Sequence, residues 1–225
     1  MLSTTFANDL LKAILNGTAI ANLLDNAASG PFTQLHFGLA TGIVGVGGDQ
    51  TTNECNYTGY ARVPVDRSSA KLPVTTNSAT NTDAIQFGEK TAGTDQTPLY
   101  WTLGTASSGS GKVLFWGPIA TASLGQFTAA VDDNFTIPGH GLSVDDKIAF
   151  LGLMGSTLPT GITEGTLYWV KSVSGDTITI SATQGGSTID ITASGDGIAY
   201  KIKAVQVTDG IVPEIPASSA VIKFY

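Results

Sequence analysis

Short segments in which apolar and polar residues alternate recur along almost the whole chain, separated by loops rich in Gly, Ser, Thr and Asn. The clearest is Gln34–Leu39, where Leu35, Phe37 and Leu39 fall on one face and His36 on the other. A period of two is that of a β-strand with one buried face. Other segments of the first half have the same character: Tyr60–Val65, Ala84–Phe87, Leu99–Gly104 and Lys112–Trp116. The pattern predicts a mainly β protein.

One stretch near the N-terminus, residues 6–28, has helical spacing instead. Its apolar side chains form a single stripe: Leu10, Leu11, Ile14, Leu15, Ile20, Leu23 and Leu24. Asn16-Gly17 lies in the middle and is able to end a first helix, with Thr18 capping a second. Such a helix packs either on a sheet of its own chain or against a neighbouring subunit, and the sequence leaves both alternatives open.

The second half of the chain is predicted to be a separate β domain, residues 123–204, inserted into the first. Its expected strands are Phe127–Val131, Phe135–Pro138, Lys147–Phe150, Leu167–Val173 and Thr177–Ser181. Ser174–Asp176 is predicted to be a hairpin turn. Residues 205–225 return to the style of residues 1–122, with Ile222 and Phe224 in a closing strand. We therefore expect a β-sandwich or barrel-like base domain (1–122 and 205–225) with an N-terminal helix, plus an inserted small all-β domain.

Charge and composition exclude several functions. Only 13% of residues are charged and the net charge is −7, without the clustered Lys and Arg that nucleic-acid binding needs. No apolar run approaches the ~18 residues that a membrane span needs, and no signal peptide is recognisable. The single cysteine, Cys55, is interpreted as a small buried filler. We expect a protein made in a host cytoplasm, with no nucleic-acid or membrane partner.

Motifs that resemble reactive sites are incomplete. Ser107–Lys112 resembles the end of a phosphate-binding loop, but Ala106 and Val113 stand where that motif needs Gly and Ser or Thr. The two histidines, His36 and His140, are far apart in sequence and lack further zinc ligands. The aspartate pairs at 132–133 and 145–146 do not follow a calcium-loop pattern, and no pair of carboxylates suggests glycoside hydrolysis. The prediction is a protein that is not an enzyme and has no cofactor and no metal.

A structural role is predicted for four residues of one loop. Glu54 and Arg62 flank the Tyr57-Thr58-Gly59-Tyr60 step, so folding back of the strand lets Arg62 pair with Glu54 and stack on Tyr57 or Tyr60. These residues would hold the shape of the loop. The alternative is two solvated charges.

The tryptophans lie in or beside alternating strands, where burial is the default expectation. For the pair Tyr168 and Trp169 a second interpretation is open. If exposed, these rings form a platform on which a sugar stacks, which makes both candidates for glycan contact.

Several segments resemble small structural proteins of tailed bacteriophages that are labelled tail fibre or head decoration. The strongest similarity is in Thr51–Ser69, and the following segments add to it: Leu11–Asn26, Leu35–Leu39, Gly104–Phe115 and Val207–Pro213. The last segment resembles a turn that in the family follows the strand at 113–116 after a short loop, so its displacement here indicates an insertion. Pro138–Ile148 and Gly165–Val170, in the insert, are similar to small β modules of phage tail, fibre and head-surface proteins.

The resemblance implies a virion structural protein and supplies no catalytic residues. Our leading expectation is a capsid decoration (cement) protein on the outer surface of the head, bound to the major capsid protein and to itself as a homotrimer. The alternative is a tail-fibre or receptor-binding component whose insert recognises host surface glycans.

Overall fold

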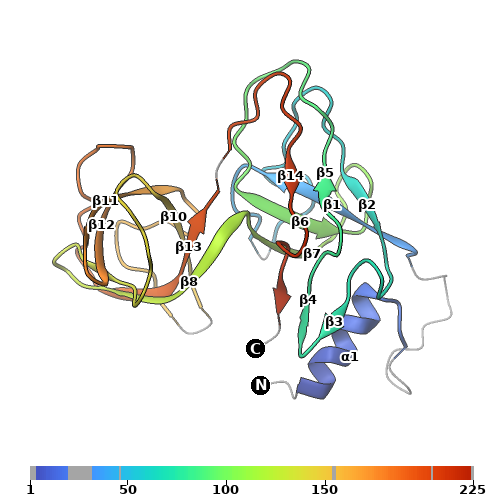
Figure 1. The fold of residues 1–225 in the computed structure, drawn as a ribbon, viewed down its shortest axis with the longest axis horizontal. Coiled ribbons are helices and arrows are strands. Elements are labelled where there is room, and N and C mark those ends of the chain that lie inside the picture. Colours follow the sequence, from blue (N-terminus) through green and yellow to red (C-terminus); the bar gives the residue numbers. More distant parts are fainter. Residues whose placement is uncertain (1–3, 20–31, 46, 154–155, 204, 224–225) are drawn as a thin grey trace. The chain divides into compact units, whose positions relative to one another are not determined.

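The computed structural model describes residues 4–19, 32–45, 47–153, 156–203 and 205–223. The chain divides into two compact units (Figure 1). The first unit comprises Met1–Gly117 and Gln206–Tyr225, and the barrel unit comprises Pro118–Val205. The sequence placed these two boundaries after residues 122 and 204.

The elements of the first unit are one helix and short strands. They are α1 (Thr4–Leu15), β1 (Gln34–Ala40), β2 (Val63–Asp66), β3 (Val74–Thr75), β4 (Ser78–Ala79), β5 (Ile85–Gln86), β6 (Tyr100–Gly104), β7 (Val113–Pro118), β14 (Glu214–Ile215) and β15 (Ile222–Lys223). The barrel unit contains β8 (Ala120–Ala129), β9 (Phe135–Thr136), β10 (Lys147–Leu151), β11 (Tyr168–Ser174), β12 (Thr177–Ser181) and β13 (Gly195–Ile202).

Helix α1 ends where the Asn16-Gly17 pair predicts. Gly17 has φ +66°, the left-handed conformation that commonly ends a helix, and the amide of Thr18 donates back to the carbonyl of Lys12 in the last turn at 3.2 Å. Leu11 and Leu15 are fully buried. The helix packs beside the β3–β4 hairpin of its own chain (Figure 1). The second half of the predicted helix, from residue 20 onward, lies outside the described residues.

The main sheet of the first unit has the strand order β2-β1-β6-β7. Strand β1 pairs antiparallel with β2 and with β6, with Phe37 opposite Val63 and Leu103. Leu35, Phe37 and Leu39 are buried, as their alternation predicts. β2 contains a proline and lies at the edge of the sheet, where its missing N–H removes no ladder bond.

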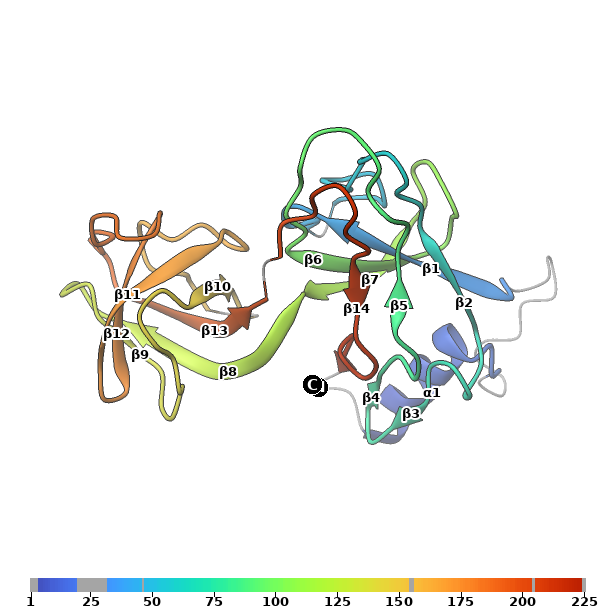
Figure 2. The ribbon, with the colours of Figure 1, turned by 45° about the horizontal axis from the view of Figure 1, so that its top comes forward.

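The C-terminal segment completes two smaller sheets of the first unit. β14 pairs with β5, and β15 pairs with β4 in the order β15-β4-β3. In both views of the ribbon, β14 and β5 lie side by side (Figure 2). The predicted closing strand is thus present at Ile222, whereas Phe224 lies outside the described residues.

The strands of the barrel unit close into a barrel in the order β10-β11-β12-β9-β8-β13. Its first and last strands, β8 and β13, are antiparallel neighbours, so the chain enters and leaves this unit through one strand pair. The predicted turn at 174–176 joins β11 to β12, where Ser174 pairs with Thr177 and Gly175 has φ +60°. The sequence predicted a strand from Phe127, whereas β8 starts at Ala120. Its first half consists mostly of small residues and lacks apolar alternation, so the pattern gave no sign of it.

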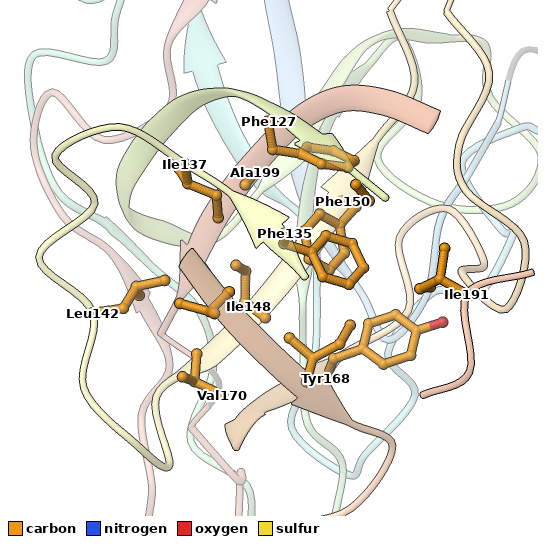
Figure 3. Close-up of a cluster of buried hydrophobic side chains, with 13 residues drawn as sticks. Phe127, Phe135, Ile137, Leu142, Ile148, Phe150, Tyr168, Val170, Ile191 and Ala199 are labelled. Carbon is orange, nitrogen blue, oxygen red and sulfur yellow. The ribbon is translucent and has the colours of Figure 1, made fainter. Parts of the chain in front are cut away.

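A core of buried apolar side chains fills the barrel (Figure 3). Its centre is aromatic. The ring of Phe150 lies 4.8 Å from that of Phe127 and 4.9 Å from that of Phe135 (centroid distances). The mainly β fold class is confirmed, with the closed barrel in the inserted unit and open sheets in the first unit.

Candidate functional site

Arg62 and Glu54 form a buried ion pair in the first unit. Arg62 Nε donates to Glu54 Oε1 at 2.6 Å and Nη2 to Oε2 at 2.7 Å, which makes the pair bidentate. The side chain of Arg62 is 2% exposed and that of Glu54 is 18% exposed. The structure therefore brings together the two charges that the sequence left either paired or solvated.

Arg62 also fixes the loop between β6 and β7. Its Nη1 donates to the carbonyl of Ala106 at 3.0 Å, and its Nη2 to that of Gly109 at 2.8 Å. The loop contains the segment that resembles a phosphate-binding motif. Strand β7 follows it, so this segment offers no helix N-terminus to a phosphate. Residues 107–110 are exposed at the tip of this loop.

Gln50 holds the same loop from inside, and sequence reasoning missed it. Gln50 is 1% exposed, and its side-chain Oε1 accepts from the backbone amide of Ala106 at 2.8 Å. Its backbone amide donates to the carbonyl of Gly111 at 2.9 Å. A Cβ on Gly111 would lie 2.1 Å from Gln50 Oε1, so the loop needs glycine at this position. The only sequence signal is the pair of glycines at 104 and 111 that makes room for this side chain.

Tyr60 and Tyr57 complete the group, which we call the Arg62 cluster (Glu54, Tyr57, Tyr60 and Arg62). The Tyr60 hydroxyl donates to Glu54 Oε1 and accepts from the amide of Leu39, both at 3.0 Å. Its ring stacks on Phe87 with an interplanar angle of 9° and meets Tyr57 edge-on at 5.4 Å. Tyr60, which the sequence offered as a stacking partner of Arg62, thus contacts the ion pair through its hydroxyl, while its ring packs on Phe87.

Burial keeps the two tyrosines of this cluster and the neighbouring Cys55 in their neutral forms. It raises the pKa of Cys55 to about 12, with a smaller contribution from the charge of Glu54. It also raises the pKa of Tyr57 to about 12, with a smaller contribution from Cys55, and raises that of Tyr60. A thiol that stays protonated at neutral pH is a poor nucleophile. The chemistry of the cluster is therefore suited to holding loops in place.

A second group, also missed from sequence, attaches the C-terminal segment. Lys90 is buried, and its ammonium pairs with Asp95 at 3.1 Å and with Asp209. The hydrogen bond to Asp209 is the main cause that raises the pKa of Lys90, so the lysine stays charged. The buried amide of Asn81 donates to the carbonyl of Pro216 at 2.9 Å and accepts from the amide of Ala220 at 2.9 Å.

The structure places the two candidate glycan contacts on opposite faces of β11. Tyr168 is 4% exposed, belongs to the barrel core (Figure 3), and accepts a bond from the amide of Thr163 at 2.9 Å. Trp169 is partly exposed on the outer side. The two rings therefore form no common platform, and of the two only Trp169 presents appreciable surface to a ligand.

The two histidines, which the sequence weighed as metal ligands, belong to different units. His140 holds a turn of the barrel, and His36 lies on β1 of the first unit. Among the described residues, no group of three or more His, Cys, Asp or Glu side chains is arranged to hold a metal ion. No helix in the described part of the chain is long and apolar enough to cross a membrane.

Comparison with known proteins identifies a family that the chain matches. No curated protein and no solved structure matches the chain. A family described as podophage GP4 fiber I protein gp80 matches residues 1–145, which include the part of the first unit before the insertion and strands β8 and β9. The chain therefore belongs to the podophage GP4 fiber I protein gp80 family, a family of tailed-phage structural proteins.

Proposed function

We propose that this protein is a structural component of a fibre on a tailed-phage particle. The observation that carries the proposal is the family match over residues 1–145, because the family is described as a fibre protein. The site geometry supports it. The Arg62 cluster and Lys90 both use buried charges to hold loops, and this function requires no catalytic step.

The two units suit different tasks in such a fibre. The matched residues include the whole of the first unit up to the insertion, so we assign to this unit the contacts that build the fibre. The barrel has its own core and joins the chain through one strand pair. Domains inserted in this way are tolerated at exposed loops, so the barrel is suited to be the displayed part.

Immunogold electron microscopy of intact particles tests the fibre proposal. Antibodies raised against the barrel unit should label projecting fibres. Particles that lack the gene product, with and without complementation in trans, provide the control. Label spread evenly over the head would contradict the fibre assignment and favour the second candidate.

The second candidate is a capsid decoration protein on the outer surface of the head. The observation that favours it is the segment Thr51–Ser69, whose resemblance includes head-decoration proteins and which contains the whole Arg62 cluster. Here the partners are the major capsid protein and two further copies of the chain. Many copies on a repeating lattice add their contacts, each above ~1,000 Å².

Cosedimentation with expanded empty heads tests this second candidate. Saturable binding, together with a trimer mass from light scattering, is the expected result. A chain that stays in the supernatant at every head concentration would exclude decoration. Arg62→Ala, which should loosen the loops of the first unit, is expected to weaken head binding, whereas an exposed barrel variant such as Val173→Ala should not.

A further inference from the structure

A groove of about 400 Å³ lies on the outer wall of the barrel. This volume falls within the range of small-molecule sites, about 300–1,000 Å³. Its lining comes from β8, β9, β13 and the residues next to β9 and β10: Gln126, Phe127, Thr128, Thr136, Pro138, Leu153, Asp196 and Gly197. All of these belong to the barrel unit.

Strand register sets three polar side chains of the groove in a row. Thr128 pairs with Thr136 on one side and with Asp196 on the other. Paired side chains on neighbouring strands have Cβ atoms about 5 Å apart, so the row extends across roughly 10 Å of barrel wall. Gln126 lies two residues before Thr128 and therefore faces the same way. The intervening Phe127 points into the core and is 1% exposed (Figure 3).

The four polar side chains of the groove are available to a ligand. Gln126, Thr128, Thr136 and Asp196 are exposed, and in the part of the chain that the structure describes their side chains make no hydrogen bond or ion pair. Elsewhere on the barrel, exposed hydroxyl groups form hydrogen bonds with one another. Thr179 bonds to Ser172 at 2.6 Å, and Thr160 bonds to Thr192 at 2.8 Å. Two hydroxyls, an amide and a carboxylate thus converge on one groove with their bonding capacity unused.

The chemistry of this set selects one ligand class. Among the described residues that line the groove, Asp196 is the only charged one, and the net charge of the chain is −7, so phosphates and acidic ligands are repelled. A carboxylate, an amide and hydroxyls are the partners of alcohol groups, since each accepts from or donates to O–H. Pro138 and Leu153 supply apolar surface for the C–H faces of a ring. A sugar offers both kinds of surface.

We propose that this groove is a binding site for a neutral, hydroxyl-rich saccharide, with Asp196, Thr128, Thr136 and Gln126 as its hydrogen-bonding residues. The site is separate from Trp169, which does not line the groove. The proposal does not depend on where the protein attaches to a particle, because purified full-length chain is sufficient to test it.

The test is binding of the full-length chain to a printed array of neutral and acidic glycans, followed by titration of the best neutral oligosaccharide by NMR of ¹⁵N-labelled protein. We expect neutral glycans to bind, with amide shifts concentrated at residues 126–128, 136 and 196. Asp196→Ala should weaken binding on the order of tenfold, because a hydrogen bond to a charged group is lost. Asp190→Ala removes another exposed carboxylate of the same unit and should leave affinity unchanged.

Thr128→Val combined with Thr136→Val provides a second variant that keeps side-chain shape and strand preference while removing both hydroxyls. It should weaken binding with an unchanged thermal midpoint. Three outcomes would overturn the proposal: no neutral glycan binds, acidic glycans bind instead, or binding survives both groove variants and is lost in Trp169→Ala. None of these outcomes bears on whether the protein is found on fibres.

Discussion

The two units of this protein are held together by different kinds of interaction. The barrel unit closes around apolar side chains, and its buried polar side chains are His140 and Ser181 among the described residues. The first unit also has an apolar core, but it buries a larger polar set: Gln50, Arg62, Asn81, Lys90 and Thr102. Most of these polar groups link segments that are far apart in the chain.

The difference follows from how each unit satisfies its backbone. A closed barrel pairs each strand on both sides, so few buried amides and carbonyls are left over. The first unit has strands of two residues, such as β5 and β14, joined by long loops. Buried backbone groups in such loops need side-chain partners, and Asn81 supplies them for Pro216 and Ala220.

In the barrel too, a buried side chain supplies hydrogen bonds to backbone groups in turns. His140 accepts from the amide of Leu142 through Nδ1 at 2.8 Å, which leaves Nε2 to donate to the carbonyl of Gly175 at 3.1 Å. This histidine joins two turns where strand pairing stops. In both units, buried polar side chains such as Gln50, Asn81 and His140 therefore lie where regular structure ends.

Truncation in the barrel core should have the largest effect and should remain local. Phe150→Ala removes a fully buried ring that contacts Phe127 and Phe135, and should cost about 4 kcal/mol. Hydrogen exchange should show lost protection of barrel amides with unchanged protection in β1 and β6. Val173→Ala, on an exposed part of β11, is the control. Equal loss in both units would mean that the two cores unfold as one.

Breaking the ion pair tests the polar interactions of the first unit. Arg62→Ala leaves Glu54 largely buried and four hydrogen bonds unmade, and should cost about 3 kcal/mol. Arg62→Lys keeps the charge but lacks the fork, so an intermediate loss is expected. Urea denaturation measures both. Lys71→Ala, which removes an exposed pair with Asp83, should change little. An unchanged urea midpoint for Arg62→Ala would contradict a structural role for the Arg62 cluster.

Removing Asn81 should loosen the C-terminal segment alone. Asn81→Ala deletes side-chain bonds to Asp83, Pro216 and Ala220 and should cost about 2 kcal/mol. Amides of residues 214–222 should exchange faster, while the barrel keeps its protection. Asn56→Ala, which removes an exposed amide pair with Gln96, is the matched control. Faster exchange throughout the first unit would show that this segment is integral to the core.

The smallest expected difference between the units is in mild acid, where the first unit should lose stability through His36. Burial, helped by the nearby charge of Arg62, lowers the pKa of His36, so the unfolded chain binds this proton more readily than the folded first unit. Its contribution to stability is fully present above the unfolded pKa of about 6.5 and is lost as pH falls through the lowered folded value. Thermal melts between pH 7.5 and 5.5 should show this loss, and His36→Gln should abolish it. A loss that persists in His36→Gln would assign it to another group.

Residue patterns alone were enough to predict strands such as β1 and the end of helix α1. Alternation at Leu35, Phe37 and Leu39 predicts β1 because a period of two places every apolar side chain on one face. Asn16-Gly17 predicts the end of α1 because glycine adopts the left-handed cap without strain. Both signals are local, so they survive without knowledge of the fold.

Only the tertiary structure decided which unit closes into a barrel and which polar residues matter. The sequence left open whether Glu54 pairs with Arg62. Two exposed charges in a loop are about as stable apart in water as they are paired, and only a fold that excludes water from them favours the pair. Asn81 and Lys90 gave no signal, and Gln50 gave none beyond the two glycines that make room for it, since their partners lie up to 139 residues away and loop residues have no periodicity. The saccharide groove likewise depends on register, which sets Thr128 between Thr136 and Asp196 only once β8, β9 and β13 have paired.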